Sequence, residues 1–383
     1  MTGAVARTTT QVMSDLHEGD PQHDPRYQPG SLIVWLRQSV ESGASDLHLV
    51  PGYPPTLRVH GDLQPLDLPA LSVAEIRHCV MPLLPPTVAE QFLTHKNADF
   101  SFHQNIDGES RRFRANVFLA HQDLGACFRV IPSKIPPLDW AGFPNQLAYR
   151  LTHFENGLVL VCGVAGSGKS TTLAMLMNLL NQEGGYRIIT VEEPIEYLFP
   201  KHTHSVITQR EVGPDVASFA DGLKYGLRQD PDVILVGEVR DRDTAQMALS
   251  AAETGHLVFS TLHTRDAKGA ISRYADLFPQ AAQADIRAQL ALSLRAVVSQ
   301  HLLPSSMHGS KRELALEIMF NNHPIASAIR QGKLESIDNC ILTGRSDGML
   351  TLDESIRRLV EAGRIASAED SSTNKRNVAP RRS

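Results

Sequence analysis

The sequence predicts an α/β protein with two folded units: a smaller α+β unit, then a unit whose parallel sheet is covered by helices on both faces. Three observations predict this. The chain has 383 residues, 42% of them hydrophobic, and it is longer than a typical single domain of about 100 to 200 residues. A proline-rich segment separates two different patterns. Beyond it, apolar strands alternate with helices, which is typical of a parallel sheet.

The α+β unit is predicted over residues 29–134, after a flexible, polar leader at 1–28. Its pattern is, in order, a helix at 32–40, strands at 45–50 and 56–63, a helix broken by prolines at 71–93, and a β-rich stretch at 99–132. The segment PSKIPPLDWAGFP then holds four prolines in 13 residues. Because proline interrupts both helices and interior strands, we expect an extended linker at 135–144.

The second unit is predicted over residues 145–284. Its strands are expected at 157–163, 187–192, 232–237 and 256–261, and its helices at 169–182, 216–228 and 241–253. A mostly helical subdomain is expected at 285–365, with one strand at 313–320, and a flexible tail at 366–383. No apolar run approaches the roughly 20 residues that span a bilayer, and the polar amino terminus makes secretion unexpected.

The composition argues against some kinds of functional site. Lys plus Arg number 37 against 42 for Asp plus Glu, a net charge of -5, so a surface for nucleic acid is not expected. The four cysteines contain no CxxC pair, which favours neither a disulfide framework nor a zinc site.

Residues 163–170 read GVAGSGKS, which matches the phosphate-binding pattern G-x-x-x-x-G-K-[ST] at every fixed position. Backbone N–H groups in such a loop surround the phosphates, and the positive end of the following helix adds attraction. We expect Lys169 to contact the β- and γ-phosphates and Ser170 to bind Mg²⁺. The predicted nucleotide-binding residues are Gly163, Val164, Ala165, Gly166, Ser167, Gly168, Lys169, Ser170 and Thr171.

Two predicted strands end in glutamates at the same edge of the sheet as this loop, because parallel strands share their carboxyl edge. DPDVILVGE ends in Glu238, and RIITVEEPIEY carries Glu192 and Glu193. Isolated glutamates are usually solvated charges, but two clusters beside a phosphate loop favour catalysis. We expect Glu238 to polarise the attacking water, with help from Glu192 or Glu193, and Glu193 to bind Mg²⁺.

A third strand, within TGHLVFSTLHT, is flanked by His256 and His263. A histidine at a strand end can contact a γ-phosphate or a neighbouring subunit, although a lone histidine is more often an ordinary polar side chain. We predict that His263 acts in catalysis and His256 in nucleotide binding.

Together these segments resemble the motor ATPases of secretion systems and type IV pili, most closely their PilT/PilU-like pilus-retraction branch. The resemblance covers about residues 30 to 364. GVAGSGKST is similar to the family's Walker A, VEEPIEY to its Asp box, DPDVILVGEVRD to its Walker B and TGHLVFSTLHT to its His box. The SDLHL, RFRAN and FRVIPSKIPPL runs are similar too.

This resemblance implies a RecA-like P-loop core, a PAS-like amino-terminal domain, and ATP with Mg²⁺ as cofactors. It implies a homohexamer in which arginines of the amino-terminal domain reach towards a nucleotide. By motif, these are Arg114 in RFRAN and Arg129 in CFRVIP, with Arg112 a weaker match. Guanidinium groups suit phosphate oxygens.

The implied function is an ATP-hydrolysing motor that powers type IV pilus retraction, and so twitching motility. Its implied partners are an inner-membrane pilus platform protein and a paralogous motor ATPase, and its implied place is the cytoplasm, peripheral at the inner membrane. A pilus-assembly, type II or type IV secretion, or conjugation ATPase is the alternative within the family. A ring helicase and a non-hydrolysing partner of a catalytic paralogue are alternatives of other classes.

The sequence departs from the family in two places. Glu193 replaces the usual aspartate of the Asp box. HPIASAIRQGK, at 323–333, keeps only the second half of an AIRNLIRE-like motif of the retraction branch. Against this, TGRSDGMLTLDESIRRLV is similar to the retraction branch, and the chain lacks the four-cysteine site of the assembly branch.

Overall fold

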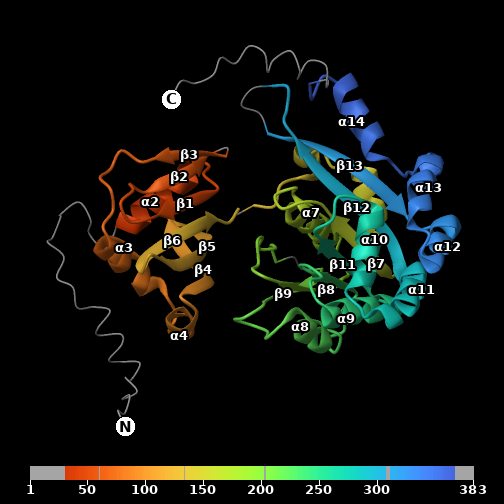
Figure 1. Ribbon diagram of the computed structural model, residues 1–383, viewed down its shortest axis with the longest axis horizontal. Helices are drawn as coiled ribbons and strands as arrows, with labels where there is room; N and C mark the ends of the chain where they lie inside the picture. Colours follow the sequence, from red (N-terminus) through yellow and green to blue (C-terminus); the bar gives the residue numbers. More distant parts are fainter. Residues whose placement is uncertain (1–30, 60, 133, 202–203, 308–310, 367–383) are drawn as a thin grey trace, which may run out of the picture. The chain divides into compact units, whose positions relative to one another are not determined.

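The computed structural model describes residues 31–59, 61–132, 134–201, 204–307 and 311–366. The chain divides between residues 133 and 134 into two compact units, each built on a sheet of its own (Figure 1). The predicted leader at 1–28 and the predicted tail, apart from residue 366, lie outside the described residues. No helix in the described part of the chain is long and apolar enough to cross a membrane.

The first unit is α+β, with an antiparallel sheet in the strand order β3-β2-β1-β6-β5-β4. Its elements are α2 (Ser31–Glu41), β1 (Asp46–Leu49), β2 (Thr56–Val59), β3 (Asp62–Pro65), α3 (Val73–Val80), η1 (Met81–Leu83), α4 (Pro86–His95), β4 (Asn97–Ile106), β5 (Glu109–Ala120) and β6 (Asp123–Val130). Alternate side chains of β5 and β6, such as Phe113 and Phe128, are fully buried in the core of this unit. The residues between them therefore face the other side of the sheet.

The second unit is larger. Its amino-terminal half contains α5 (Leu138–Ala141), α6 (Asn145–Thr152), β7 (Gly157–Cys162), α7 (Lys169–Glu183), β8 (Arg187–Glu192), β9 (Val206–Glu211), α8 (Phe219–Gly226), β10 (Val233–Val236), α9 (Arg242–Glu253) and β11 (Leu257–Leu262). Its carboxyl-terminal half contains α10 (Ala267–Asp276), η2 (Gln280–Ala282), α11 (Gln283–Ser293), β12 (Leu294–Leu303), β13 (Glu313–Phe320), α12 (His323–Gln331), η3 (Leu334–Ser336), α13 (Ile337–Thr343), η4 (Gly344–Asp347) and α14 (Leu352–Glu361).

The sheet of this unit runs in the order β13-β12-β7-β11-β10-β8-β9, and every neighbouring pair is parallel except β12 with β13. The chain moves one way along the sheet from β7 through β8 to β9 and the opposite way from β9 through β10 to β11. Because such crossovers are right-handed, α7 covers one face, and α8 and α9 cover the other. β7 is buried along its whole length. The predicted parallel sheet between two helical layers is confirmed.

The proline-rich segment departs from its prediction. It contains the short helix α5, whose start follows Pro137 and whose end is marked by Gly142 at φ +70°. Three of the four prolines precede the helix and Pro144 follows it, so LDWA is free to form one turn. Ile135 and Leu138 pack against the core of the second unit, so this segment belongs to that unit and is not a wholly extended linker.

The prediction for the second unit lacks two strands. β12 lies within the stretch expected to be mostly helical, and it joins the central sheet beside β7. It follows α11 with no turn residue between them, so the sequence does not mark where the helix ends. β9 is the edge strand of this sheet and, among the residues that the structure describes, pairs with β8 alone. Its sequence VITQRE has too few apolar residues to show the pattern of a buried strand.

Candidate nucleotide site

The GVAGSGKS segment connects β7 to α7, which is the strand–loop–helix setting that a phosphate loop requires. Gly163 has φ +150°, and a Cβ there would lie 2.4 Å from Ser167 Oγ and 2.6 Å from the carbonyl oxygen of Gln300. No larger residue fits this close approach. Gly166, at φ +75°, would place a Cβ in open space. The loop is therefore tightly packed at Gly163 and open at Gly166.

Lys169 directs its ammonium group back into this loop. Its Nζ donates to the carbonyl oxygens of Gly163 at 3.0 Å and Val164 at 3.1 Å, and the residue is only 8% exposed. Burial lowers the pKa of Lys169, and the negative charge of Glu238 opposes that shift. The structure thus brings Lys169 and Glu238 close enough for their charges to interact.

Glu238 is the centre of a charged cluster at the carboxyl edge of the sheet. One of its carboxylate oxygens accepts a hydrogen bond from Arg240, and Nε2 of His263 lies 3.4 Å from the other. Arg240 also donates to Oε2 of Glu193 at 2.9 Å. The predicted residues Glu193, Glu238 and His263, which follow β8, β10 and β11, therefore belong to one connected group.

Arg240 is the member of this group that sequence reasoning missed. It stands two positions after Glu238 in DPDVILVGEVRD. In an extended segment, side chains two positions apart face the same side. That spacing, directly after a buried strand, is the signal that could have found it.

Glu192 lies apart from this group and is held inside the unit. Its carboxylate accepts hydrogen bonds from the Thr190 hydroxyl at 2.6 Å and the Gln209 amide at 3.2 Å. Burial raises its pKa to about 7, although both hydrogen bonds act in the opposite direction. Of the two adjacent glutamates, Glu193 rather than Glu192 is linked to Glu238.

We expect the Glu192→Gln variant to gain stability relative to the native protein as the pH rises. Because the folded-state pKa of Glu192 lies above its unfolded value, the folded protein binds more protons between about pH 4.5 and 7. Its free energy of unfolding therefore falls as the pH rises through that window. Glutamine at position 192 does not titrate, so the variant avoids this fall in the free energy of unfolding, which amounts to roughly 1 to 3 kcal/mol. The thermal unfolding midpoints of the variant and the native protein at pH 5 and pH 8 check this. A difference between the two proteins that is the same at both pH values would contradict it.

A side-chain hydrogen bond positions the first turn of α7. The Thr171 hydroxyl is hydrogen-bonded to the Tyr197 hydroxyl at 2.9 Å, which connects the helix to the segment after β8. Ser170 is the second residue of α7 and is partly exposed. Its hydroxyl and the Glu193 carboxylate are hard oxygen donors, and Mg²⁺ typically takes one or two protein oxygens together with nucleotide phosphates. Both donors are therefore of the chemical type that Mg²⁺ prefers.

His256 lies at the opposite edge of the sheet, and its predicted nucleotide contact is corrected. Its carbonyl accepts from the N–H of Gly157, the first residue of β7, so it sits where the parallel strands begin. Its ring is within hydrogen-bond distance of the Ala251 carbonyl at 3.0 Å and the Thr254 hydroxyl at 3.3 Å. These contacts secure the end of α9, far along the strand from the phosphate loop.

Arg114 and Arg129 belong to the first unit, where they occupy facing positions on β5 and β6. The same register continues through Asp46 on β1 to Arg58 on β2, so one face of the sheet carries a row of four charges. Nε of Arg129 donates to Asp46 at 2.8 Å, and Arg114 contacts Asp99 at 3.4 Å. Like charges at facing positions destabilise a sheet. Each of the two arginines has a carboxylate partner, and these partners offset the repulsion between them.

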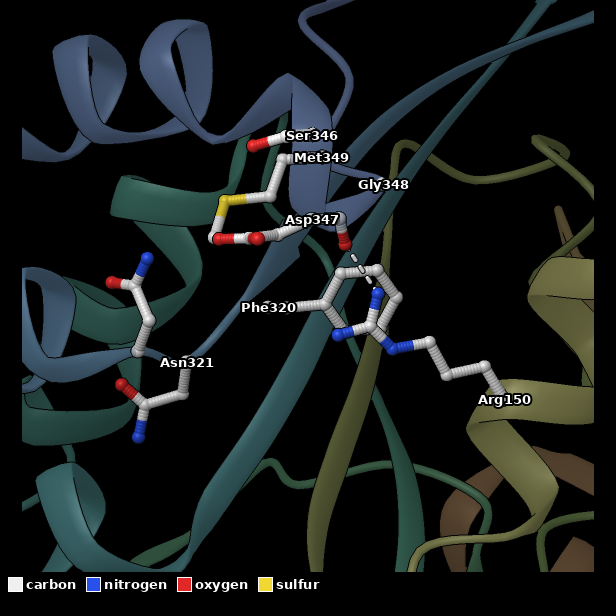
Figure 2. A pocket seen from close by; sticks show the side chains of 8 residues that line it. Arg150, Phe320, Asn321, Ser346, Asp347, Gly348 and Met349 are labelled. Atoms are coloured by element: carbon white, nitrogen blue, oxygen red, sulfur yellow. Dashed lines mark hydrogen bonds between the residues drawn. The ribbon is translucent and has the colours of Figure 1, made fainter.

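A cavity of about 380 Å³ in the second unit lies away from this site (Figure 2). Its lining includes Phe320, which pairs with Ala296 near the start of β12 and so marks the edge opposite the phosphate loop. The Arg150 guanidinium stacks 3.4 Å above the Phe320 ring centre and donates to the carbonyl of Asp347. This contact joins α6 to the segment before α14, and none of the predicted nucleotide residues lines the cavity.

Comparisons with known proteins agree with this geometry. Residues 35–379 match the model of the family described as type II/IV secretion system protein. The chain is 41% identical over 331 residues to the type IV pilus retraction ATPase PilT of Pseudomonas aeruginosa, covering 86% of this chain and 94% of that relative. It is 35% identical over 330 residues to the type IV pilus ATPase PilU of the same organism, covering 86% of this chain and 85% of that relative. A crystal structure of the pilus retraction motor PilT with bound ADP superimposes with a TM-score of 0.77 at 40% identity, covering 88% of this chain and 95% of that one.

Proposed function

The chain belongs to the type II/IV secretion system protein family and is an ATPase, and from this premise we propose that it powers the retraction of a type IV pilus. The main support is the 41% identity with PilT, which extends over 94% of that relative. The identity therefore includes both units of the chain and not only the phosphate loop. The similarity of TGRSDGMLTLDESIRRLV to the retraction branch points the same way.

We propose that residues 163–171 hold the phosphates of ATP, with the Lys169 ammonium on the β- and γ-phosphates. Ser170 and Glu193 would hold Mg²⁺, which neutralises charge on the phosphate oxygens when it is bound. The Glu238 carboxylate accepts a proton from, and so polarises, the water that attacks the γ-phosphate. His263 lies on the other oxygen of Glu238 and orients it.

The proposal extends to a homohexamer in which each site is completed by a neighbour. Arg114 and Arg129 would supply positive charge to a nucleotide held by another copy, where they would stabilise the transferring γ-phosphoryl group. The support is their facing placement on neighbouring strands, which brings two guanidinium groups together on one face of the sheet. An arginine carried by a separate unit makes hydrolysis depend on the position of that unit.

The motor would act on an inner-membrane pilus platform protein. We therefore propose that the motor lies in the cytoplasm, peripheral at that membrane. The 35% identity with PilU supports a paralogous motor as a second partner. ATP binding would close the two units of neighbouring subunits together, and release of ADP and phosphate would reopen them.

Deletion of the gene in the bacterium that encodes it tests the proposed direction of work. We expect cells that keep surface pili but lose pilus retraction and twitching motility. A plasmid copy of the native gene should restore both, and a Glu238→Gln copy should restore neither. Loss of surface pili in the deletion strain would contradict retraction and favour an assembly ATPase, and loss of a secreted protein would favour a secretion ATPase.

A further inference from the structure

Arg240 joins the tips of two neighbouring strands. Nη1 donates to Oε2 of Glu193, after β8, at 2.9 Å, and Nη2 donates to Oε1 of Glu238, after β10. β8 and β10 are adjacent in the sheet, so a single guanidinium group spans them. Nε2 of His263 lies 3.4 Å from Oε2 of Glu238. Arg240 therefore restrains one oxygen of this carboxylate, and His263 restrains the other.

The two halves of this bridge differ in environment. The Glu238 side chain is 14% exposed, against 42% for Glu193 and 57% for Arg240. Exposed ion pairs contribute little to stability, whereas a carboxylate withdrawn from water needs a partner. The contact with Glu238 therefore carries most of the interaction, and Glu193 mainly anchors the outer end of the guanidinium group.

We propose that Arg240 is a positioning residue for ATP hydrolysis, which fixes the carboxylate of Glu238 by bridging it to Glu193. This inference rests on the proposed role of Glu238 as the group that polarises the attacking water. A carboxylate that is free to rotate offers its oxygen in the required direction for only part of the time. The bridge restricts that rotation without a contact of its own to the reacting atoms.

Only arginine can form this bridge. Its planar group presents two N–H donors in a fixed geometry, whereas a lysine ammonium is a single point that cannot reach both carboxylates in the same way. Lysine at position 240 would retain the positive charge but lose the fixed orientation. The comparison between the two residues therefore separates orientation from charge.

The test compares the full-length variants Arg240→Lys, Arg240→Gln and Glu193→Gln with the native protein, measuring kcat, KM and the Kd of a fluorescent ADP analogue. We expect Arg240→Gln to lower kcat about 10- to 100-fold and Arg240→Lys to lower it severalfold or more, with KM and Kd changed less than threefold. The double variant Arg240→Gln with Glu193→Gln should lose less activity than the product of the two single losses, because both changes break the same bridge, while any contribution of Glu193 to Mg²⁺ binding appears equally in the single and the double variant.

Arg242→Gln is the matched control, because Arg242 is exposed at the start of α9, and we expect native kinetics from it. Native kcat in Arg240→Gln, or a loss that appears in KM and Kd rather than in kcat, would overturn the inference. So would full rescue by lysine or effects of Arg240 and Glu193 that simply multiply. If Glu238→Gln also hydrolyses ATP at the native rate, the proposed role of Glu238 fails as well, which distinguishes the two failures.

Discussion

The Lys169→Ala variant is expected to lose ATP hydrolysis to background and to bind nucleotide about 10- to 150-fold more weakly. The loss follows from the position of Nζ, which lies within the phosphate loop at 3.0 Å from the Gly163 carbonyl. A hydrogen bond to a charged group contributes about 1.5 to 3 kcal/mol, which corresponds to that range of affinity. Alanine removes both the charge and the donors on the β- and γ-phosphates. Titration with a fluorescent ATP analogue, together with a phosphate-release assay, measures both effects.

Lys224→Ala is the matched control for this variant. Lys224 is exposed on α8, and its substitution by alanine removes the same side-chain atoms. Nucleotide binding and hydrolysis by Lys224→Ala should therefore equal those of the native protein. A circular dichroism spectrum of Lys169→Ala identical to that of the native protein shows that the fold is kept. Native affinity in a folded Lys169→Ala variant would mean that the 163–171 loop does not hold the nucleotide.

The Glu238→Gln variant is expected to bind ATP as the native protein does but to hydrolyse it about 10²- to 10⁴-fold more slowly. Glutamine has nearly the same shape as glutamate and keeps an oxygen that can accept from Arg240, so the cluster should stay in place. The amide cannot accept the proton of the attacking water. Glu253→Gln, at the exposed end of α9, should retain native activity. A fall in affinity equal to the fall in rate would instead assign Glu238 a role in binding.

The central sheet could be predicted from the sequence because its strands are unambiguous. GLVLVC in β7 and VILV in β10 are buried at every position, so continuous apolar runs mark them. β12 could not be predicted in the same way, since α11 passes directly into it and the sequence LRAVVSQHLL also fits a helix. Its pairing with β7 on one side and β13 on the other decides in favour of a strand.

In the candidate site too, some features could be predicted from the sequence and others could not. The phosphate loop and Glu238 followed from spacing, because a strand that ends at a known edge places whatever comes next. The separate environments of Glu192 and Glu193 did not, since the chain bends after β8 and only the neighbouring Gln209 and Arg240 distinguish the two carboxylates. The position of His256 could have been inferred, because a residue before a parallel strand lies at the edge opposite the phosphate loop.

Identification of the nucleotide that remains bound to Glu238→Gln tests the account most directly. After incubation with ATP and Mg²⁺, rapid removal of free nucleotide and acid quenching, chromatography of the released nucleotide should give mainly intact ATP from the variant and mainly ADP from the native protein. If the variant instead yields ADP at the rate of the native protein, Glu238 does not polarise the attacking water, and the carboxyl-edge cluster is not the hydrolytic centre.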